Sequence, residues 1–141
     1  MGYVASLTLD KILTTSLSFN YPMATETPID PEAIENLRAL NPDDDNAFLR
    51  EIIGIFLEDT PQRIAELKEC LSVFDQPRFT RAAHSIKGSA SNLGATQVRA
   101  VAETLEYQSR NSGLNGLAEL LATLEIVFAV AKAELERIAS S

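Results

Sequence analysis

The chain has very few residues that form covalent cross-links or bind transition metals. Its 141 residues include one cysteine, Cys70, and one histidine, His84. A single cysteine excludes an internal disulfide, and one cysteine with one histidine excludes a conventional zinc cluster. No stretch approaches the ~18 consecutive apolar residues that span a membrane. The N-terminus also lacks the basic region of a signal peptide. We therefore expect a cytoplasmic protein with no metal site and no membrane segment.

Positive charge is also scarce. Lysine and arginine number 12 against 20 aspartates and glutamates, which gives a formal net charge of −8. A nucleic-acid-binding protein normally carries a basic face, so this balance argues against that class of partner. Hydrophobic residues make up 45% and charged residues 23%, as in ordinary soluble globular proteins. The length fits one domain with a single core.

The first 28 residues differ from the rest of the chain. They are rich in serine and threonine, carry little charge and end with Pro22 and Pro28. We interpret residues 1–28 as an extension or linker, with a short helix over Val4 to Leu17. Residues 29–141 form the predicted domain. Throughout that region no strand-like alternation is sustained, so every element is expected to be helical.

Two signals mark the first helices of the domain. Asp30 followed by Pro31 is a favourable start for a short helix over 31–40. After the break at "NPDDDN", Asp45 or Asn46 can cap a second, long helix. Its apolar register continues across Pro61, which favours one helix with a kink there, although "DTP" could also cap a new helix. The register consists of Leu49, Ile53, Phe56, Thr60, Ile64, Leu67, Leu71 and Phe74.

Three further amphipathic helices follow, joined by short loops. One covers "DQPRFTRAAHSIKGSASNL" and is closed by Gly94, and the next covers "ATQVRAVAETLEYQSR". The last has the clearest period of the chain: Leu117, Leu121, Leu124, Phe128, Ala131, Leu135 and Ile138. The predicted fold is therefore all-α, an antiparallel four-helix bundle with an additional short N-terminal helix.

The only histidine lies on the polar side of its helix. At about 100° per residue, His84 falls about 140° from Phe79, away from the face that carries Ile86, Ala90 and Leu93. Its neighbours on the same side, within roughly 60°, are Thr80, Lys87, Gly88 and Ser91. His84 is therefore expected to be exposed on a rigid element.

The residues around His84 suit phosphoryl chemistry. A neutral imidazole nitrogen is a good nucleophile and can hold a phosphoryl group covalently. The ammonium of Lys87 can neutralise phosphoryl oxygens. Gly88 costs the helix roughly 1 kcal/mol against alanine, and it leaves bare backbone where a partner can approach. An incidental surface histidine is the alternative that these residues leave open.

The stretch "AHSIKGSASNLGA" resembles the signature of histidine-containing phosphotransfer (HPt) domains, in which His-x-x-Lys-Gly precedes small residues and Leu-Gly. The resemblance covers about residues 29 to 138. It implies that His84 is the phospho-acceptor through Nε2, that Lys87 contacts the phosphoryl group, and that Gly88 lets a receiver domain dock. It also implies that Glu106, on the next helix, hydrogen-bonds the other ring nitrogen.

Weaker candidates complete the predicted site. Arg81, Ser91 and Thr80 are candidates for the rim on which a receiver docks. The resemblance implies a phosphocarrier of a two-component phosphorelay rather than an enzyme, with no cofactor of its own and with Mg²⁺ held by the receiver. The implied partners are response-regulator receiver domains, a hybrid sensor histidine kinase, or both, and we expect a monomer.

A second class of function remains open from the residues alone. The chain could be a helical adaptor that binds signalling partners through an apolar groove, with His84 incidental. The sequence does not say which kinase or receivers the chain serves, the input signal, or the direction of phosphoryl flow. It also does not say whether the domain acts alone or within a hybrid kinase.

Overall fold

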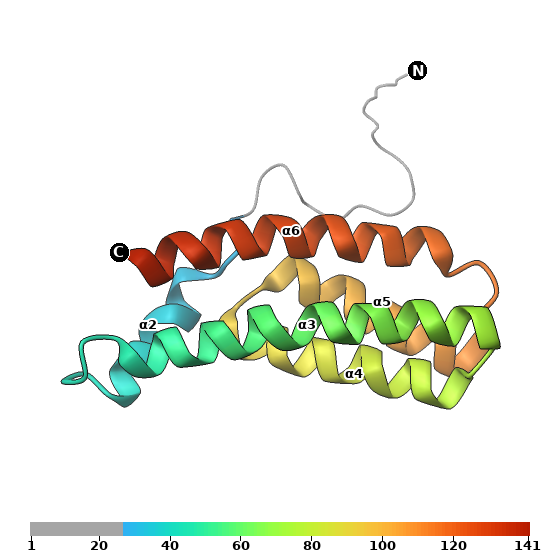
Figure 1. The fold of residues 1–141 in the computed structure, drawn as a ribbon, viewed down its shortest axis with the longest axis horizontal. Helices are drawn as coiled ribbons and strands as arrows, with labels where there is room; N and C mark the ends of the chain where they lie inside the picture. The colour runs from blue at the N-terminus through green and yellow to red at the C-terminus, as the bar shows by residue number, and fades with distance from the viewer. Residues whose placement is uncertain (1–26) are drawn as a thin grey trace, which may run out of the picture.

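The computed structural model describes residues 27–141, and all the regular elements in that range are α-helices. The helices are α2 (Pro31–Leu40), α3 (Ala47–Val73), α4 (Gln76–Leu93), α5 (Thr96–Ser112) and α6 (Ala118–Ser140). Figure 1 shows the four long helices lying side by side, with α2 at the end of the molecule that also carries the C-terminus. The predicted extension, with its helix over Val4 to Leu17, lies almost wholly outside the described residues and stays a prediction.

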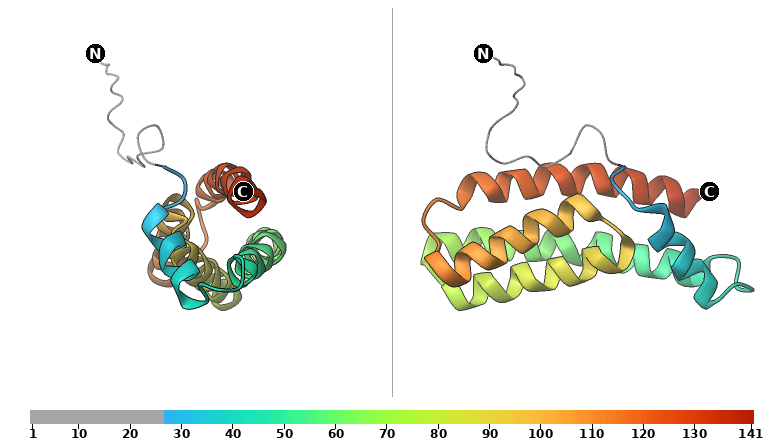
Figure 2. Two further views of the ribbon diagram at one scale, coloured as in Figure 1. Left: turned by 90° about the vertical axis from the view of Figure 1, so that its left-hand side faces the viewer. Right: turned by 180° about the vertical axis from the view of Figure 1, so that it is seen from behind.

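The long helices form a four-helix bundle in which each packs against its neighbours in the chain. Contacts join α3 to α4, α4 to α5, α5 to α6 and α6 back to α3, so α6 lies diagonally opposite α4. The end-on view in Figure 2 shows this arrangement. Short connections reverse the direction of the chain between successive helices. The predicted all-α bundle with an additional short N-terminal helix is confirmed.

A single hydrophobic core fills the bundle, and it contains the predicted apolar register almost completely. The rings of Phe56 on α3 and Phe128 on α6 pack with centroids 5.7 Å apart. The helix α3 runs without interruption through Pro61, so the predicted continuity is confirmed, while the kink at Pro61 stays a prediction. The neighbouring Thr60 is buried. Burial of these stripes, rather than helix propensity, supplies most of the stability of such helices.

Helix ends agree with the sequence at two places. Asp30 caps α2 by accepting a hydrogen bond from the backbone N–H of Glu32, with Pro31 at the first helical position. Gly94 closes α4 in the left-handed conformation, with φ of 70°. Its carbonyl accepts a hydrogen bond of 2.8 Å from the backbone N–H of Asp30, which ties the start of α2 to the turn between α4 and α5.

One prediction about α3 is confirmed only in position, and another is wrong. Asn46 is the N-cap residue of α3, as one of the two predicted alternatives, but its left-handed backbone leaves its side chain without a capping hydrogen bond; Asp44 accepts a hydrogen bond from the backbone N–H of Phe48 instead. Phe74 does not continue the buried register. The helix ends at Val73, Phe74 turns left-handed with φ of 58°, and its side chain is 73% exposed.

Candidate functional site

His84 lies midway along α4 with its ring in solvent. The opposite face of the helix is packed into the bundle and consists of Phe79, Ala82, Ala83, Ile86, Ala90 and Leu93. The side chain of His84 is 66% exposed, which confirms the predicted orientation. A packed helix holds the ring at a fixed position while solvent and partners reach its outer edge.

Glu106 of α5 contacts the inner edge of the ring. Its Oε2 lies 2.8 Å from Nδ1 of His84, so the predicted contact between the two residues is present. The carboxylate is deeply buried, with only 5% of the side chain exposed. The close packing of α4 against α5 brings Glu106 under the ring.

The ionisation state of Glu106 fixes the tautomer of His84. Burial by itself would raise the pKa of this carboxyl, but hydrogen bonds from Lys87, His84 and Arg110 outweigh it and lower the pKa to about 2. An ionised carboxylate can only accept hydrogen bonds, so Nδ1 of His84 must carry the hydrogen. In the neutral ring, Nε2 is then left with a free lone pair on the exposed side.

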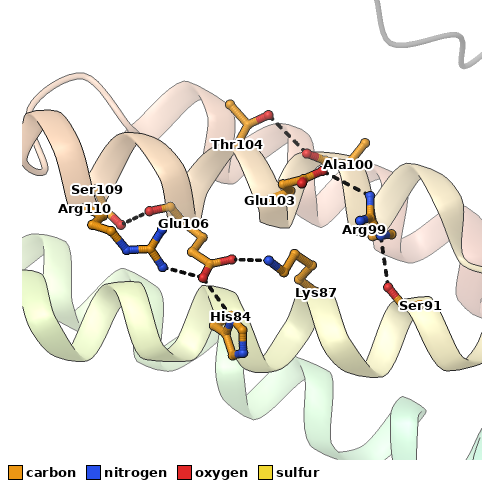
Figure 3. A network of polar contacts seen from close by, with 10 residues as sticks. All are labelled: His84, Lys87, Ser91, Arg99, Ala100, Glu103, Thr104, Glu106, Ser109 and Arg110. Atoms are coloured by element: carbon orange, nitrogen blue, oxygen red, sulfur yellow. Dashed lines mark hydrogen bonds and ion pairs between the residues drawn. The ribbon is translucent and has the colours of Figure 1, made fainter.

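Two cations flank the same carboxylate, and Figure 3 shows them on either side of the ring. Nζ of Lys87 lies 2.7 Å from Oε1 of Glu106. The guanidinium of Arg110 donates to Oε2 over 2.6 Å. Glu106 thus holds the ammonium of Lys87 beside His84.

Arg110 is the residue of this site that the sequence reasoning missed. It lies four residues after Glu106 on α5, and a glutamate followed by arginine at that spacing is a known stabilising pair on a helix face. That spacing was the available signal. The spacing indicates the ion pair between Glu106 and Arg110. It does not indicate that Arg110 and His84 contact the same oxygen of Glu106, because that depends on how α4 and α5 pack.

Gly88 leaves the surface one turn beyond His84 bare. The residue is exposed, and a Cβ added there would meet no atom within 4 Å. Nothing inside the domain therefore requires glycine at this position. The helical backbone is open to an approaching molecule, as predicted, at the place where the outer edge of the imidazole is also exposed.

The predicted rim residues have different surroundings. Arg81 is exposed, one turn before His84, and makes no ion pair or hydrogen bond with any residue of 27–141. The hydroxyl of Ser91 accepts a hydrogen bond from Arg99. Thr80 is half-buried, and its hydroxyl lies 2.7 Å from the hydroxyl of Ser109 on α5.

An open depression of about 340 Å³ beside the ring brings several of these side chains together. Its lining consists of Thr80, Arg81, His84, Ser85, Glu106 and Arg110. Ser91, by contrast, does not line this depression. Within residues 27–141 no cluster of three or more histidine, cysteine or acidic side chains is arranged to hold a metal ion. The same residues include no helix with the length and hydropathy needed to cross a bilayer.

Comparisons with known proteins agree with this geometry. The family model described as "Hpt domain" matches residues 51–141. The chain is 27% identical over 92 residues to multistep phosphorelay regulator 1 of Schizosaccharomyces pombe, which covers 65% of this chain and 31% of that protein. It is 23% identical over 103 residues to histidine-containing phosphotransfer protein 2 of Arabidopsis thaliana, covering 71% of this chain and 66% of that one. The chain thus matches about a third of the first relative and two thirds of the second.

The fold also matches a solved structure. The crystal structure of histidine-containing phosphotransfer protein B from Pseudomonas aeruginosa superposes with a TM-score of 0.74. The match covers 82% of this chain and 97% of that one at 22% sequence identity. At 22% identity this likeness shows that the two proteins share the fold of the bundle.

Proposed function

The chain belongs to the Hpt domain family, and from that membership we propose that it carries phosphoryl groups in a two-component phosphorelay through Nε2 of His84. One observation carries the assignment of the residue. The ring presents Nε2 to solvent, while a buried carboxylate holds the other ring nitrogen 2.8 Å away. His84 is also the only histidine in the chain.

The transfer step needs no proton acceptor. Nε2 attacks the phosphorus of an aspartyl phosphate on a receiver domain, the new N–P bond forms, and the P–O bond to the aspartyl carboxylate breaks. The hydrogen on Nδ1 stays in place, so the phosphorylated ring becomes a cation. The negative charge of Glu106 stabilises that cation through the existing hydrogen bond. The reverse step returns the phosphoryl group to an aspartate.

Lys87 and Arg110 fit the charge of the phosphoryl group. Both carry a positive charge beside the ring, and both are bound to Glu106 before transfer. A phosphoryl group on Nε2 adds negatively charged oxygens at the outer edge of the ring. Lys87 is flexible and can shift its ammonium toward these oxygens, while Glu106 keeps the hydrogen bond from the imidazole.

We assign the remaining roles to partners. The cationic surroundings of His84 suit an anionic group and not a divalent cation, which supports placing Mg²⁺ on the receiver domain. On this proposal the chain takes its phosphoryl group from a receiver domain or a hybrid kinase and has no autonomous catalysis.

We further propose that it acts in the cytoplasm as a monomer. Light scattering at working concentrations tests whether the chain is monomeric in solution.

Incubation with a receiver domain labelled on its aspartate tests the function. The chain should acquire label that is lost in acid and retained in alkali, as expected of a phosphoramidate. His84→Gln should acquire none while its melting temperature stays near that of wild type, because the exposed ring packs little. With ATP and Mg²⁺ alone, no label should appear. A wild-type chain that binds receivers but never becomes labelled would be an adaptor instead.

A further inference from the structure

The charges of the molecule are unevenly distributed among the helices. The chain has a net charge of −8, yet α4 carries three cations and no carboxylate: Arg78, Arg81 and Lys87. The helix α3 carries five carboxylates against three cations, and α6 carries four against two. The helix that bears His84 is therefore the basic element of an acidic protein, and acidic α6 lies diagonally opposite it.

Around His84 the local charge is positive even after ion pairing. Lys87 and Arg110 share one carboxylate, that of Glu106. Arg81 adds a third cation on the rim of the same depression and has no partner among residues 27–141. Glu103, the other acidic residue of α5, is already paired with Arg99. Three cations thus surround the ring against one buried carboxylate.

The stability of the fold does not explain Arg81. Within residues 27–141 its side chain makes no hydrogen bond or ion pair, and it projects from a helix whose other face forms the core. Arg78, three residues earlier on the same helix, shows the contrast. That residue bridges to Glu66 and Glu69 of α3 and so joins two helices.

From this distribution we propose that the surface formed by Arg81, Lys87 and Arg110 around His84 steers partners that present an acidic face, and that Arg81 is its free steering charge. The proposal rests on the proposed function and specifies which surface of a partner fits. A protein that presents an aspartyl phosphate beside carboxylates that hold a divalent cation has such a face. The acidic remainder of this chain would repel that face in other orientations.

Electrostatic steering makes a distinctive kinetic prediction. Complementary charges raise the rate of encounter by 10- to about 1,000-fold at low salt, and the gain disappears as salt screens it. A charge at the rim of an interface acts mainly on the association rate and its salt dependence. Arg81 should therefore matter for the second-order rate constant of transfer, and less so as the ionic strength rises.

The test compares Arg81→Glu with Lys132→Glu. Lys132 lies exposed on α6 and makes no ion pair within residues 27–141, and its replacement by glutamate changes the net charge by the same amount. Transfer from a phosphorylated receiver is measured by rapid quench between about 20 mM and about 300 mM salt. We expect Arg81→Glu to lower the second-order rate constant roughly three- to tenfold at low salt, with the difference shrinking at high salt. Lys132→Glu should stay near wild type, and Arg81→Gln should fall between.

Three results would overturn the proposal. Equal rate constants for Arg81→Glu and Lys132→Glu would mean that only the net charge matters. A salt-independent wild-type rate would exclude steering. A slower first-order step in the saturated complex of Arg81→Glu at every salt concentration would indicate a disturbed acceptor. Each result presupposes labelled wild-type protein, so failure of the proposed function is recognised separately, as the absence of any label. Melting temperatures check that the variants fold.

Discussion

Nδ1 of His84 lies 2.8 Å from Oε2 of Glu106, and the two side chains differ sharply in exposure, at 66% and 5%. The pair therefore joins a solvent-facing ring to a buried anion. A buried charge is tolerated only where other groups satisfy it, and here Lys87 and Arg110 do so. The relationship sets the tautomer before any partner arrives.

Glu106→Gln should slow transfer while leaving a hydrogen bond to the ring possible. The amide oxygen can still accept from Nδ1, but the variant lacks the charge that stabilises the phosphorylated ring and pairs with Lys87. Hydrogen bonds to charged groups contribute about 1.5–3 kcal/mol, so we expect a loss of roughly 10- to 100-fold in the transfer rate. Glu103→Gln is the matched control, since Glu103 is exposed on the same helix and forms its ion pair with Arg99, away from the ring. Equal rates for the two variants would contradict the role of Glu106.

The same carboxylate should make stability depend on acid pH. Its pKa falls from an ordinary value of 4.5 to about 2 in the folded protein. A lowered pKa means that the ionised group stabilises the fold above the unfolded value, and that this contribution is lost as the pH falls toward 2. The stability of wild type relative to Glu106→Gln should thus decline between pH about 5 and about 2. Urea unfolding across that range measures the difference in the free energy of unfolding between the two proteins.

The comparison isolates Glu106 from other carboxyls. Glu66 and Glu134, whose pKa values are also lowered, titrate in both proteins, so their contributions cancel in the difference. Parallel curves would show that Glu106 is not the group responsible.

Gly88 and Gly54 provide a matched comparison of stability with function. Both are exposed within helices, and a Cβ at either would meet nothing within 4 Å. Alanine at each should stabilise the protein by about 1 kcal/mol, from helix propensity alone. Glutamine at each should also fold, but only Gly88→Gln places a side chain one turn from His84. A misplacement of about 1 Å at the reacting atoms can cost on the order of a hundredfold in rate.

The comparison is decided by measuring melting and transfer on the same samples. Gly88→Gln should transfer far more slowly than wild type, while Gly54→Gln, on α3, should transfer normally. Normal transfer by Gly88→Gln would mean that the bare backbone at this position is not used for docking.

Gly94→Ala should destabilise the domain. The residue has φ of 70°, which costs an L-residue about 1–2 kcal/mol, and the added Cβ would lie 2.7 Å from Cβ of Ala33. The Cβ of Ala33 is attached directly to the backbone of α2 and cannot rotate away, so α2 would have to move. Gly116→Ala is the control, since its φ is also positive, at 82°, but its surroundings are open. Chemical denaturation should show a larger loss for Gly94→Ala than for Gly116→Ala, and equal losses would mean that α2 adjusts freely.

Patterns along single helices predicted most of the fold. The period of α6 placed Leu121, Leu124 and Leu135 in the core, and all three are buried. The cap at Asp30 and the closing Gly94 follow from local chemistry. The start of α3 does not, because the backbone of Asp45 and Asn46 turns left-handed and moves the capping role to Asp44. Several acidic side chains in succession compete for such a role, and the loop geometry decides among them.

The site was predictable where it depends on one helix and not where it depends on two. The exposure of His84 and the open surface at Gly88 follow from the register of α4. The depth of Glu106 and its three donors depend on the packing of α4 against α5, which no period along one helix specifies. A resemblance to a family identified Glu106 as a partner of the ring. It did not indicate that Lys87 and Arg110 would share its carboxylate.

Nitrogen NMR of the single imidazole, before and after phosphoryl transfer, tests the central claim most directly. With one histidine in the chain, every imidazole signal belongs to His84. In the neutral ring we predict a hydrogen on Nδ1 and none on Nε2, and after transfer a coupling between phosphorus and Nε2 with the hydrogen on Nδ1 retained. Phosphorus on Nδ1, a resting ring with its hydrogen on Nε2, or label on any other residue would contradict the account.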